Sequence, residues 1–236
     1  MSGSDRVSMA TVNAIIFDLD GCLVDSEPLC LAAIAEEMRE IGIVDATADE
    51  IGERFLGVSF AEIVRYAEGR LGHTAPLDFA NRVEARLFDV YQTELRRIPG
   101  TIELLSALHA QAVGLAIATG GSLLRMKTTL RIAGLEGWFG GTQCSAEEVS
   151  RGKPAPDVFE LALARLGVSA GDCLVVEDSP HGIAGAVSAG IPAVGFVGGS
   201  HLDGRRSGHA QILRDAGALT VFDNVSDFQE FLFVDA

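Results

Sequence analysis

The chain has 236 residues, 48% of them hydrophobic and 22% charged, with a formal net charge of −15 at pH 7. This composition fits a compact soluble α/β protein and argues against extended disorder or a disulfide-stapled scaffold. The negative charge argues against nucleic acid and anionic membranes as partners. The length fits one domain with a smaller insert, and we expect a monomer or small homo-oligomer.

The cysteines and the N-terminal segment indicate a cytoplasmic location. Four cysteines lie far apart and form no C-x-x-C pair, so we expect them to be reduced. The first dozen residues lack a secretory pattern, and no apolar run approaches the ~20 residues that span a bilayer. Residues 1–5 are polar and predict a disordered tail.

The first predicted element is a buried parallel strand at residues 13–19, which stops at an acidic sequence. Similar apolar runs occur at residues 113–118, 173–176, 191–197 and 219–222, with helical patterns between most of them. Strands that alternate with helices predict a doubly wound parallel sheet with a Rossmann-like core. In such a sheet ligands bind beyond the carboxyl ends of the strands, so we expect the site there.

Residues 28–97 interrupt this alternation, because their pattern is helical and contains no convincing strand. Glycines 42, 57 and 72 divide the interval into roughly four stretches, each able to bury one apolar face in a small bundle. We therefore expect a helical cap at 28–97, inserted between core segments 1–27 and 98–236.

Two acidic pairs follow predicted strands. Asp18 and Asp20 lie two residues apart at the end of the first strand, so extended geometry projects both to one side. Glu177 and Asp178 follow the strand at 173–176. Crowded carboxylates repel, and Mg²⁺ would relieve that repulsion. The alternatives are a solvated strand end for the first pair and a helix N-cap for the second.

Two further segments can bind an anion. The loop at 119–122, Thr-Gly-Gly-Ser, follows a strand and opens a helix, although an ordinary glycine turn is the alternative. It matches neither the Walker P-loop nor the dinucleotide fingerprint, so no nucleotide cofactor is implied. Lys153 is one of only two lysines and lies in a loop before a helix that begins at Pro156. Its ammonium suits a phosphate oxygen, whereas a solvent-facing lysine is the alternative.

Taken in order, these segments resemble the haloacid dehalogenase superfamily. The motifs are D-L-D-G at 18–21, T-G-G-S at 119–122, K-P-A-P-D at 153–157 and E-D-S-P-H-G-I at 177–183. The chain looks like the branch with a small helical cap, which includes β-phosphoglucomutase and many sugar-phosphate phosphatases. The resemblance implies magnesium-dependent hydrolysis of small phosphate monoesters, such as sugar, polyol or sugar-acid phosphates.

The resemblance also implies roles for the acidic residues. Asp18 would attack phosphorus, and Asp20 would protonate the leaving oxygen and later activate water. Mg²⁺ would be held by Asp18, by the backbone carbonyl of Asp20 and by Asp178, with Glu177 a direct or water-mediated ligand.

For phosphate binding the resemblance implies Thr119, with Gly120 beside it, and Lys153. Arg54 lies in the insert, where it can either reach a substrate anion or merely flank a helix end. We expect no role for His181, because Asp20 already serves as the base, and none for His201 and His209, which lack metal-ligand spacing. The pairs Glu147-Glu148 and Arg125 with Lys127 are expected to face water.

A phosphomutase is the main alternative within this family. Aligned without gaps from Asp18, the acid/base histidine of the mutase cap falls at Cys30. Aligned on the segment 56–59, the lysine and arginine with which such mutases hold the second phosphate fall at Leu56 and Phe60. These departures favour hydrolysis. Asp20 argues against a dehalogenase, and the absence of lysine from residues 28–97 argues against a phosphonate hydrolase. A non-catalytic binding protein with this fold is the alternative from another class.

Overall fold

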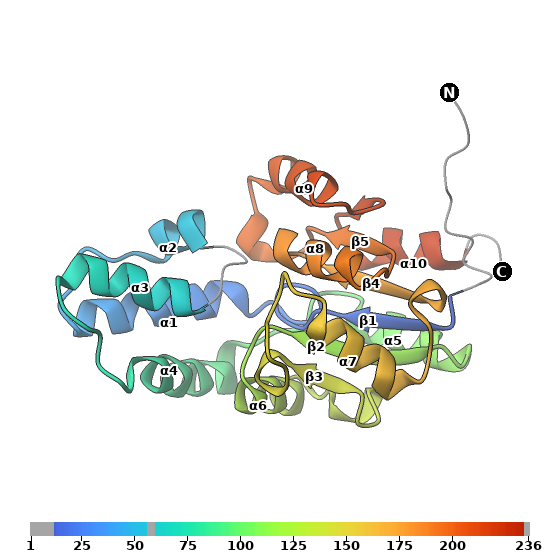
Figure 1. Ribbon diagram of the computed structural model, residues 1–236, viewed down its shortest axis with the longest axis horizontal. Helices are drawn as coiled ribbons and strands as arrows, with labels where there is room; N and C mark the ends of the chain where they lie inside the picture. Colours follow the sequence, from blue (N-terminus) through green and yellow to red (C-terminus); the bar gives the residue numbers. More distant parts are fainter. Residues whose placement is uncertain (1–11, 56–59, 234–236) are drawn as a thin grey trace.

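A computed structural model describes residues 12–55 and 60–233 (Figure 1). The predictions made for residues 1–5, Leu56 and Gly57 lie outside these ranges. Figure 1 shows the helices that follow the first strand at one end of the molecule and a sheet flanked by helices at the other.

The sheet contains six parallel strands in the order β3-β2-β1-β4-β5-β6. The strands are β1 Ala14–Phe17, β2 Gly114–Thr119, β3 Gln143–Ser145, β4 Cys173–Glu177, β5 Ala193–Phe196 and β6 Val221–Phe222. From β1 the chain first adds β2 and β3 on one side and then β4, β5 and β6 on the other, so β2 and β4 lie next to β1. The three strand ends that carry the acidic pairs and the Thr-Gly-Gly-Ser loop are therefore neighbours.

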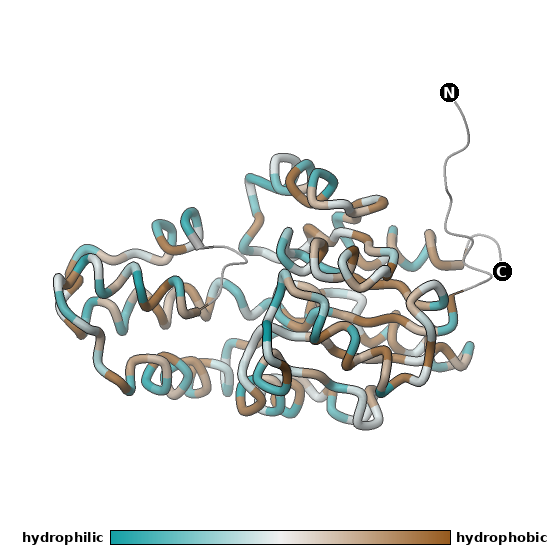
Figure 2. Tube along the Cα trace, viewed as in Figure 1, coloured by the Kyte–Doolittle hydropathy of each residue, from teal (hydrophilic) through white to brown (hydrophobic). Residues whose placement is uncertain are grey.

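Alternating side chains of β1, β2, β4 and β5 enter two separate cores. Ile15 and Phe17 of β1 pack in one cluster with α5 Thr101–Ala110, α6 Leu123–Ala133 and α10 Val225–Phe233. Ala14 and Ile16 pack in the other cluster with α7 Asp157–Leu166, α8 Pro180–Ser188 and α9 Arg206–Asp215. Figure 2 shows that the strands between these helices are mostly hydrophobic. A strand covered on both faces reads as a continuous apolar run, which is why the pattern predicted the doubly wound parallel sheet correctly.

Four helices occupy the interval after β1: α1 Glu27–Glu40, α2 Ala48–Phe55, α3 Phe60–Leu71 and α4 Phe79–Glu94. The buried Glu37 of α1 pairs with Arg82 at 2.8 Å and Arg86 at 2.7 Å on α4, which compensates its charge and joins the two helices. Gly42 and Gly72 follow helix ends and adopt positive φ, as the sequence pattern suggested for breaks.

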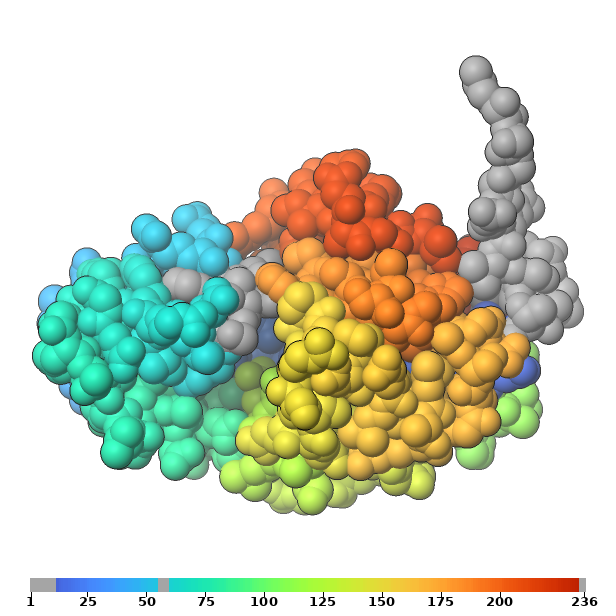
Figure 3. Space-filling model, in the orientation of Figure 1, coloured from blue at the N-terminus to red at the C-terminus, as the bar shows by residue number. Residues whose placement is uncertain are grey.

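Two adjacent segments connect these helices to the sheet. The amide of Asp25 donates to the Arg96 carbonyl at 2.8 Å, and the amide of Ile98 donates to the Leu23 carbonyl at 3.0 Å. Because both crossings are hydrogen-bonded to each other, the helices leave and rejoin the core at one place. Figure 3 shows a recess between α3–α4 and the segment near residue 150 of the core.

The sequence pattern missed β3, since its three residues, Gln-Cys-Ser, are too few and too polar to stand out. The four cysteines are free and buried. Among the described residues no helix has the length and apolar character needed to cross a bilayer.

Candidate active site

A cavity of about 450 Å³ lies where α1, α3 and α4 face the carboxyl edge of the sheet. At its floor are Asp18 and Asp20 after β1, Thr119 at the end of β2, and Glu177 and Asp178 at the end of β4. All five are buried. The strand order thus brings together the acidic pairs and the threonine that the sequence analysis singled out.

Lys153 reaches this floor from the loop before α7. Its Nζ lies 2.6 Å from Asp18 Oδ1 and also donates to Glu177 Oε1. Burial acts to lower the pKa of Lys153, but the carboxylates of Asp18 and Glu177 outweigh it and raise the pKa. The ammonium is therefore a fixed positive charge beside Asp18, and the solvent-facing alternative is wrong for this lysine.

Asp20 has different partners. Arg125 Nη2 lies 3.0 Å from Asp20 Oδ1, and Ser26 Oγ donates to the same oxygen. The Arg125 side chain is 15% exposed and lines the cavity, so the expectation that it faces water was wrong. The expectation holds for Lys127, which is exposed. The sequence of α6 alone did not show that Arg125 is buried and Lys127 exposed, because the partners of Arg125 come from α1 and from the loop after β1.

Glu177 is fully buried, and both of its oxygens have hydrogen-bond partners. Oε1 accepts from Lys153, and Oε2 accepts from the Ser179 amide at 3.2 Å. A Cβ on Gly182 of α8 would lie 1.9 Å from the Glu177 carboxyl carbon, so only glycine leaves room for this side chain. The spacing of Glu177 and Gly182 in the E-D-S-P-H-G-I motif therefore has a steric reason.

Two histidines contact Asp178. His201 Nε2 lies 3.2 Å from Asp178 Oδ2, and His209 Nε2 lies 2.6 Å from the Asp178 carbonyl oxygen. Asp178 Oδ2 also approaches Gly21, where a Cβ would come within 1.9 Å of it. Sequence spacing gave no role to these histidines, because they follow β5 and only the strand order brings them to β4.

The Thr119 loop is held by local hydrogen bonds. The Gly121 amide donates to Thr119 Oγ1 at 3.1 Å, and Ser122 Oγ accepts from the Arg125 amide at 2.9 Å, which caps α6. A Cβ on Gly120 would meet no atom within 4 Å, so the backbone there is open to the cavity it lines. The amides and the hydroxyl of such a loop can bind an anion.

The donor atoms near Asp18 suit a hard divalent cation. Asp18, Cys22 and Asp178 each place one potential ligand atom within 4.8 Å of the others. Burial and the nearby Asp178 and Asp18 raise the pKa of the Cys22 thiol, so it stays protonated and only the two carboxylates supply hard oxygens. Burial also raises the pKa of Asp18, with Lys153 opposing it and the neighbouring carboxylates adding to it. A cation would offset this crowding of acids.

Other predicted residues lie away from the floor. The Arg54 side chain is 58% exposed, pairs with Glu50 at 3.6 Å and is not among the residues that line the cavity. Its role in substrate binding stays a prediction. His181 lines the cavity, and its buried Nδ1 has no hydrogen-bond partner among the described residues. Glu147 and Glu148 are exposed, and Glu148 pairs with Arg165 at 2.6 Å.

Comparison with known proteins identifies the family. The haloacid dehalogenase-like hydrolase family matches residues 12–190. The chain is 33% identical over 190 residues to hexitol phosphatase A of Escherichia coli, covering 76% of this chain and 80% of that protein. It is 30% identical over 197 residues to 6-phosphogluconate phosphatase of the same organism, covering 82% of this chain and 86% of that protein.

The crystal structure of a hydrolase of this family from Deinococcus radiodurans R1, with bound phosphate and sodium, has a TM-score of 0.74. It is 31% identical, and the match covers 94% of this chain and 96% of that one. These findings confirm the resemblance drawn from the four motifs. The chain therefore belongs to the haloacid dehalogenase-like hydrolase family and is a phosphatase.

Proposed function

We propose that this enzyme hydrolyses small phosphate monoesters of sugars, polyols or sugar acids with Mg²⁺, through a phosphoryl group carried on Asp18. The observation that carries the proposal is the position of Asp18 on the cavity floor, 2.6 Å from the buried Lys153 ammonium and next to Asp178. A nucleophilic carboxylate needs positive charge beside it, because it must approach a phosphate dianion.

In the first step a carboxylate oxygen of Asp18 attacks phosphorus, and the bond between phosphorus and the leaving oxygen breaks. Lys153 and the Thr119–Gly120 loop bind the oxygens of the transferring phosphoryl group. The contact between Lys153 and Glu177 supports this role, since it fixes the ammonium before substrate arrives.

Asp20 gives its proton to the leaving oxygen in this step. In the second step it takes a proton from water, which attacks phosphorus and releases phosphate and the free Asp18 carboxylate. Arg125 and Ser26 hold the Asp20 side chain in one place, which supports a role in proton transfer that depends on position.

Asp18, Asp178 and the backbone carbonyl of Asp20 would hold Mg²⁺. When bound, the cation would neutralise charge on the phosphoryl oxygens and orient them. Glu177 would act on it through water at most, because its two oxygens already bind Lys153 and the Ser179 amide. His201 and His209 would orient Asp178 from behind.

Helices α1 to α4 serve as a cap that closes the cavity over the leaving group. This is the role that we propose for the insert expected at residues 28–97. The cavity volume of about 450 Å³ suits a small monoester. The paired crossings at Leu23–Ile98 and Asp25–Arg96 form the joint between cap and core.

The phosphomutase alternative receives no support from the described residues of the cap. Cys30 is buried and accepts a hydrogen bond from Arg125 Nη1 at 3.3 Å, and Phe60 presents an apolar side chain to the cavity. Leu56, the other departure from the mutase pattern, lies outside the described residues.

The test combines two assays. With p-nitrophenyl phosphate we expect phosphate release that requires Mg²⁺, stops with a chelator and returns when Mg²⁺ is restored. With β-glucose 1-phosphate and its bisphosphate activator we expect free phosphate to outpace glucose 6-phosphate. Activity unchanged by chelation, or faster isomerisation than release, would contradict the proposal.

A further inference from the structure

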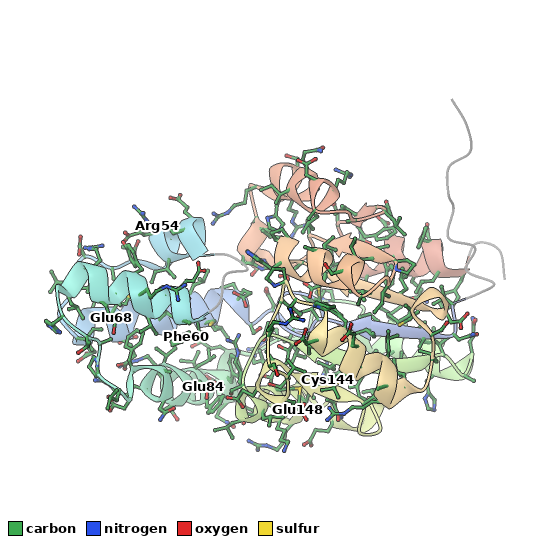
Figure 4. All side chains as sticks on the ribbon, viewed as in Figure 1. Arg54, Phe60, Glu68, Glu84, Cys144 and Glu148 are labelled. Atoms are coloured by element: carbon green, nitrogen blue, oxygen red, sulfur yellow. The ribbon has the colours of Figure 1, made fainter. Side chains whose placement is uncertain are left out.

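The half of the cavity away from Asp18 is mostly apolar. Side chains from α1, α3 and α4 line it, among them Leu31, Ile34, Phe60, Ile63, Val83 and Leu87. Two carboxylates, Glu27 at the start of α1 and Glu84 within α4, line the cavity where this apolar wall meets the catalytic end. Figure 4 labels Glu84 on α4 near the sheet-bearing end of the molecule, whereas Arg54 lies on α2 away from it.

The positively charged side chains that line the cavity pair with carboxylates at its catalytic end. Among the described lining residues, Lys153 and Arg125 carry permanent positive charge. Lys153 contacts Asp18 and Glu177, and Arg125 lies 3.0 Å from Asp20 and 3.8 Å from Glu27. Residues 56–59, Leu-Gly-Val-Ser, add no charged side chain to the sequence. The apolar half therefore gains no cation from the described residues.

Glu84 places a negative charge beside the phosphate-binding loop. Its Oε1 accepts a hydrogen bond from Ser122 Oγ at 2.6 Å, and Ser122 directly follows the Thr119-Gly120-Gly121 segment. Within the described residues no lysine, arginine or histidine nitrogen lies within the 4.0 Å ion-pair distance of Glu84. Its charge is therefore not compensated by an ion pair with any of these residues.

We propose, on the basis of the function proposed above, that the enzyme prefers monoesters whose leaving group carries no negative charge, and that Glu84 disfavours a second anion. The cavity that has Asp18 at its floor is also lined by Glu84, so we expect a leaving group attached to phosphorus above Asp18 to pass this carboxylate before it reaches the apolar half. Like charges repel more strongly in a partly buried apolar cavity than in water, and salt screens them less there. Among the proposed substrates, polyol phosphates are therefore expected to react faster than the corresponding sugar-acid phosphates.

The test uses substrate pairs that differ only in this charge. Glucitol 6-phosphate and 6-phosphogluconate share a six-carbon chain and differ at one end, a hydroxymethyl group against a carboxylate. Glycerol phosphate and 3-phosphoglycerate form a second pair of three carbons. For wild-type enzyme with saturating Mg²⁺, we expect kcat/KM to favour the uncharged member of each pair by about tenfold or more.

Glu84→Gln keeps the shape of the side chain and an oxygen acceptor for Ser122 but removes the charge. It should raise kcat/KM for the charged substrates about fivefold or more and leave the uncharged ones within about threefold. Glu84→Lys should reverse the preference. Glu94→Gln is the matched control: it removes one charge from an exposed position on the same helix, outside the cavity lining, and should leave the preference unchanged.

An equal or better rate with the charged substrates in wild-type enzyme would overturn the inference, and so would an unchanged preference in Glu84→Gln. p-Nitrophenyl phosphate separates this failure from failure of the proposed function. If the wild-type enzyme hydrolyses it with Mg²⁺ but shows no charge preference, only the charge preference is contradicted. If no monoester is hydrolysed, both the proposed function and the charge preference are contradicted.

Discussion

Arg125 Nη2 lies 3.0 Å from Asp20 Oδ1, and this contact joins helix α6 to the loop that follows β1. Arg125 also lies 3.8 Å from Glu27 and donates to Cys30 Sγ at 3.3 Å. A guanidinium presents its donors in a rigid fork, so it can fix one carboxylate while it contacts other groups. The position of the proposed acid and base therefore depends on a residue of another element.

Replacing Arg125 should impair proton transfer to the leaving group. Arg125→Ala should lower kcat/KM about tenfold or more for glycerol phosphate, whose alkoxide needs a proton, but far less for p-nitrophenyl phosphate. Lys127→Ala, an exposed cation two residues along the same helix, is the control and should match wild type. Equal losses for both substrates, or none, would contradict the role given to Arg125.

Removing the histidine behind Asp178 should weaken magnesium binding. His201 Nε2 lies 3.2 Å from Asp178 Oδ2, and loss of such an orienting partner typically costs about tenfold or more in metal affinity. We expect His201→Ala to raise the half-saturating Mg²⁺ concentration by about that factor and to recover most activity at high Mg²⁺. His73→Ala, exposed in the loop after α3, should change nothing. The same half-saturating concentration in both variants would refute this role.

A methyl group at residue 182 should displace Glu177. The Cβ of Gly182→Ala would lie 1.9 Å from the Glu177 carboxyl carbon, although alanine favours helices over glycine by about 1 kcal/mol. We expect a lower melting temperature and a loss of kcat of about a hundredfold, because Glu177 positions Lys153. Gly69→Ala in α3 meets no atom within 4 Å and is the control, with stability equal or higher. A fully active Gly182→Ala enzyme would show that this packing has no role.

The stability of the apo-protein should depend on pH through Glu27. Burial raises the pKa of Glu27 from 4.5 to about 7, against the opposing charge of Arg125 and with Asp20 and Asp178 adding to it, while His201 opposes it. The folded state thus holds the proton more tightly than the unfolded state, so this stabilisation is complete below pH 4.5 and lost as pH rises through 7. Glu27→Gln should raise the melting temperature relative to wild type by a few degrees at pH 8 and not at pH 5. An equal difference at both pH values would contradict this titration.

The sequence predicted the parts of the site that lie on single strands. Asp18, Thr119 and Glu177 each follow an apolar run whose end could be read directly, and a parallel sheet brings such ends to one edge. The contact of Arg125 with Asp20 could not be predicted from the sequence, because a cation on an amphipathic helix gives the same pattern whether it faces water or a buried carboxylate. His201 was missed for a similar reason: its contact with Asp178 depends on β5 lying beside β4, which local sequence does not specify.

The arrangement of the helices inserted after β1 could also be predicted only in part. Helical periodicity and the glycines at 42 and 72 indicated helices between β1 and α5, but not which of their faces meets the sheet edge. Glu84 illustrates this limit, since its spacing from the apolar residues of α4 is that of any half-buried residue on an amphipathic helix. Its contact with Ser122, 38 positions along the chain, gives it a place in the cavity.

The central claim is that Asp18 is the nucleophile, and Asp18→Asn tests it most directly. The amide keeps the shape of the side chain but cannot attack phosphorus, so kcat with Mg²⁺ and p-nitrophenyl phosphate should fall by about a thousandfold or more. Circular dichroism should show an unchanged fold, since removing one of several crowded carboxylates relieves repulsion. Turnover within about tenfold of wild type, in protein free of wild-type contamination, would exclude Asp18 as the nucleophile.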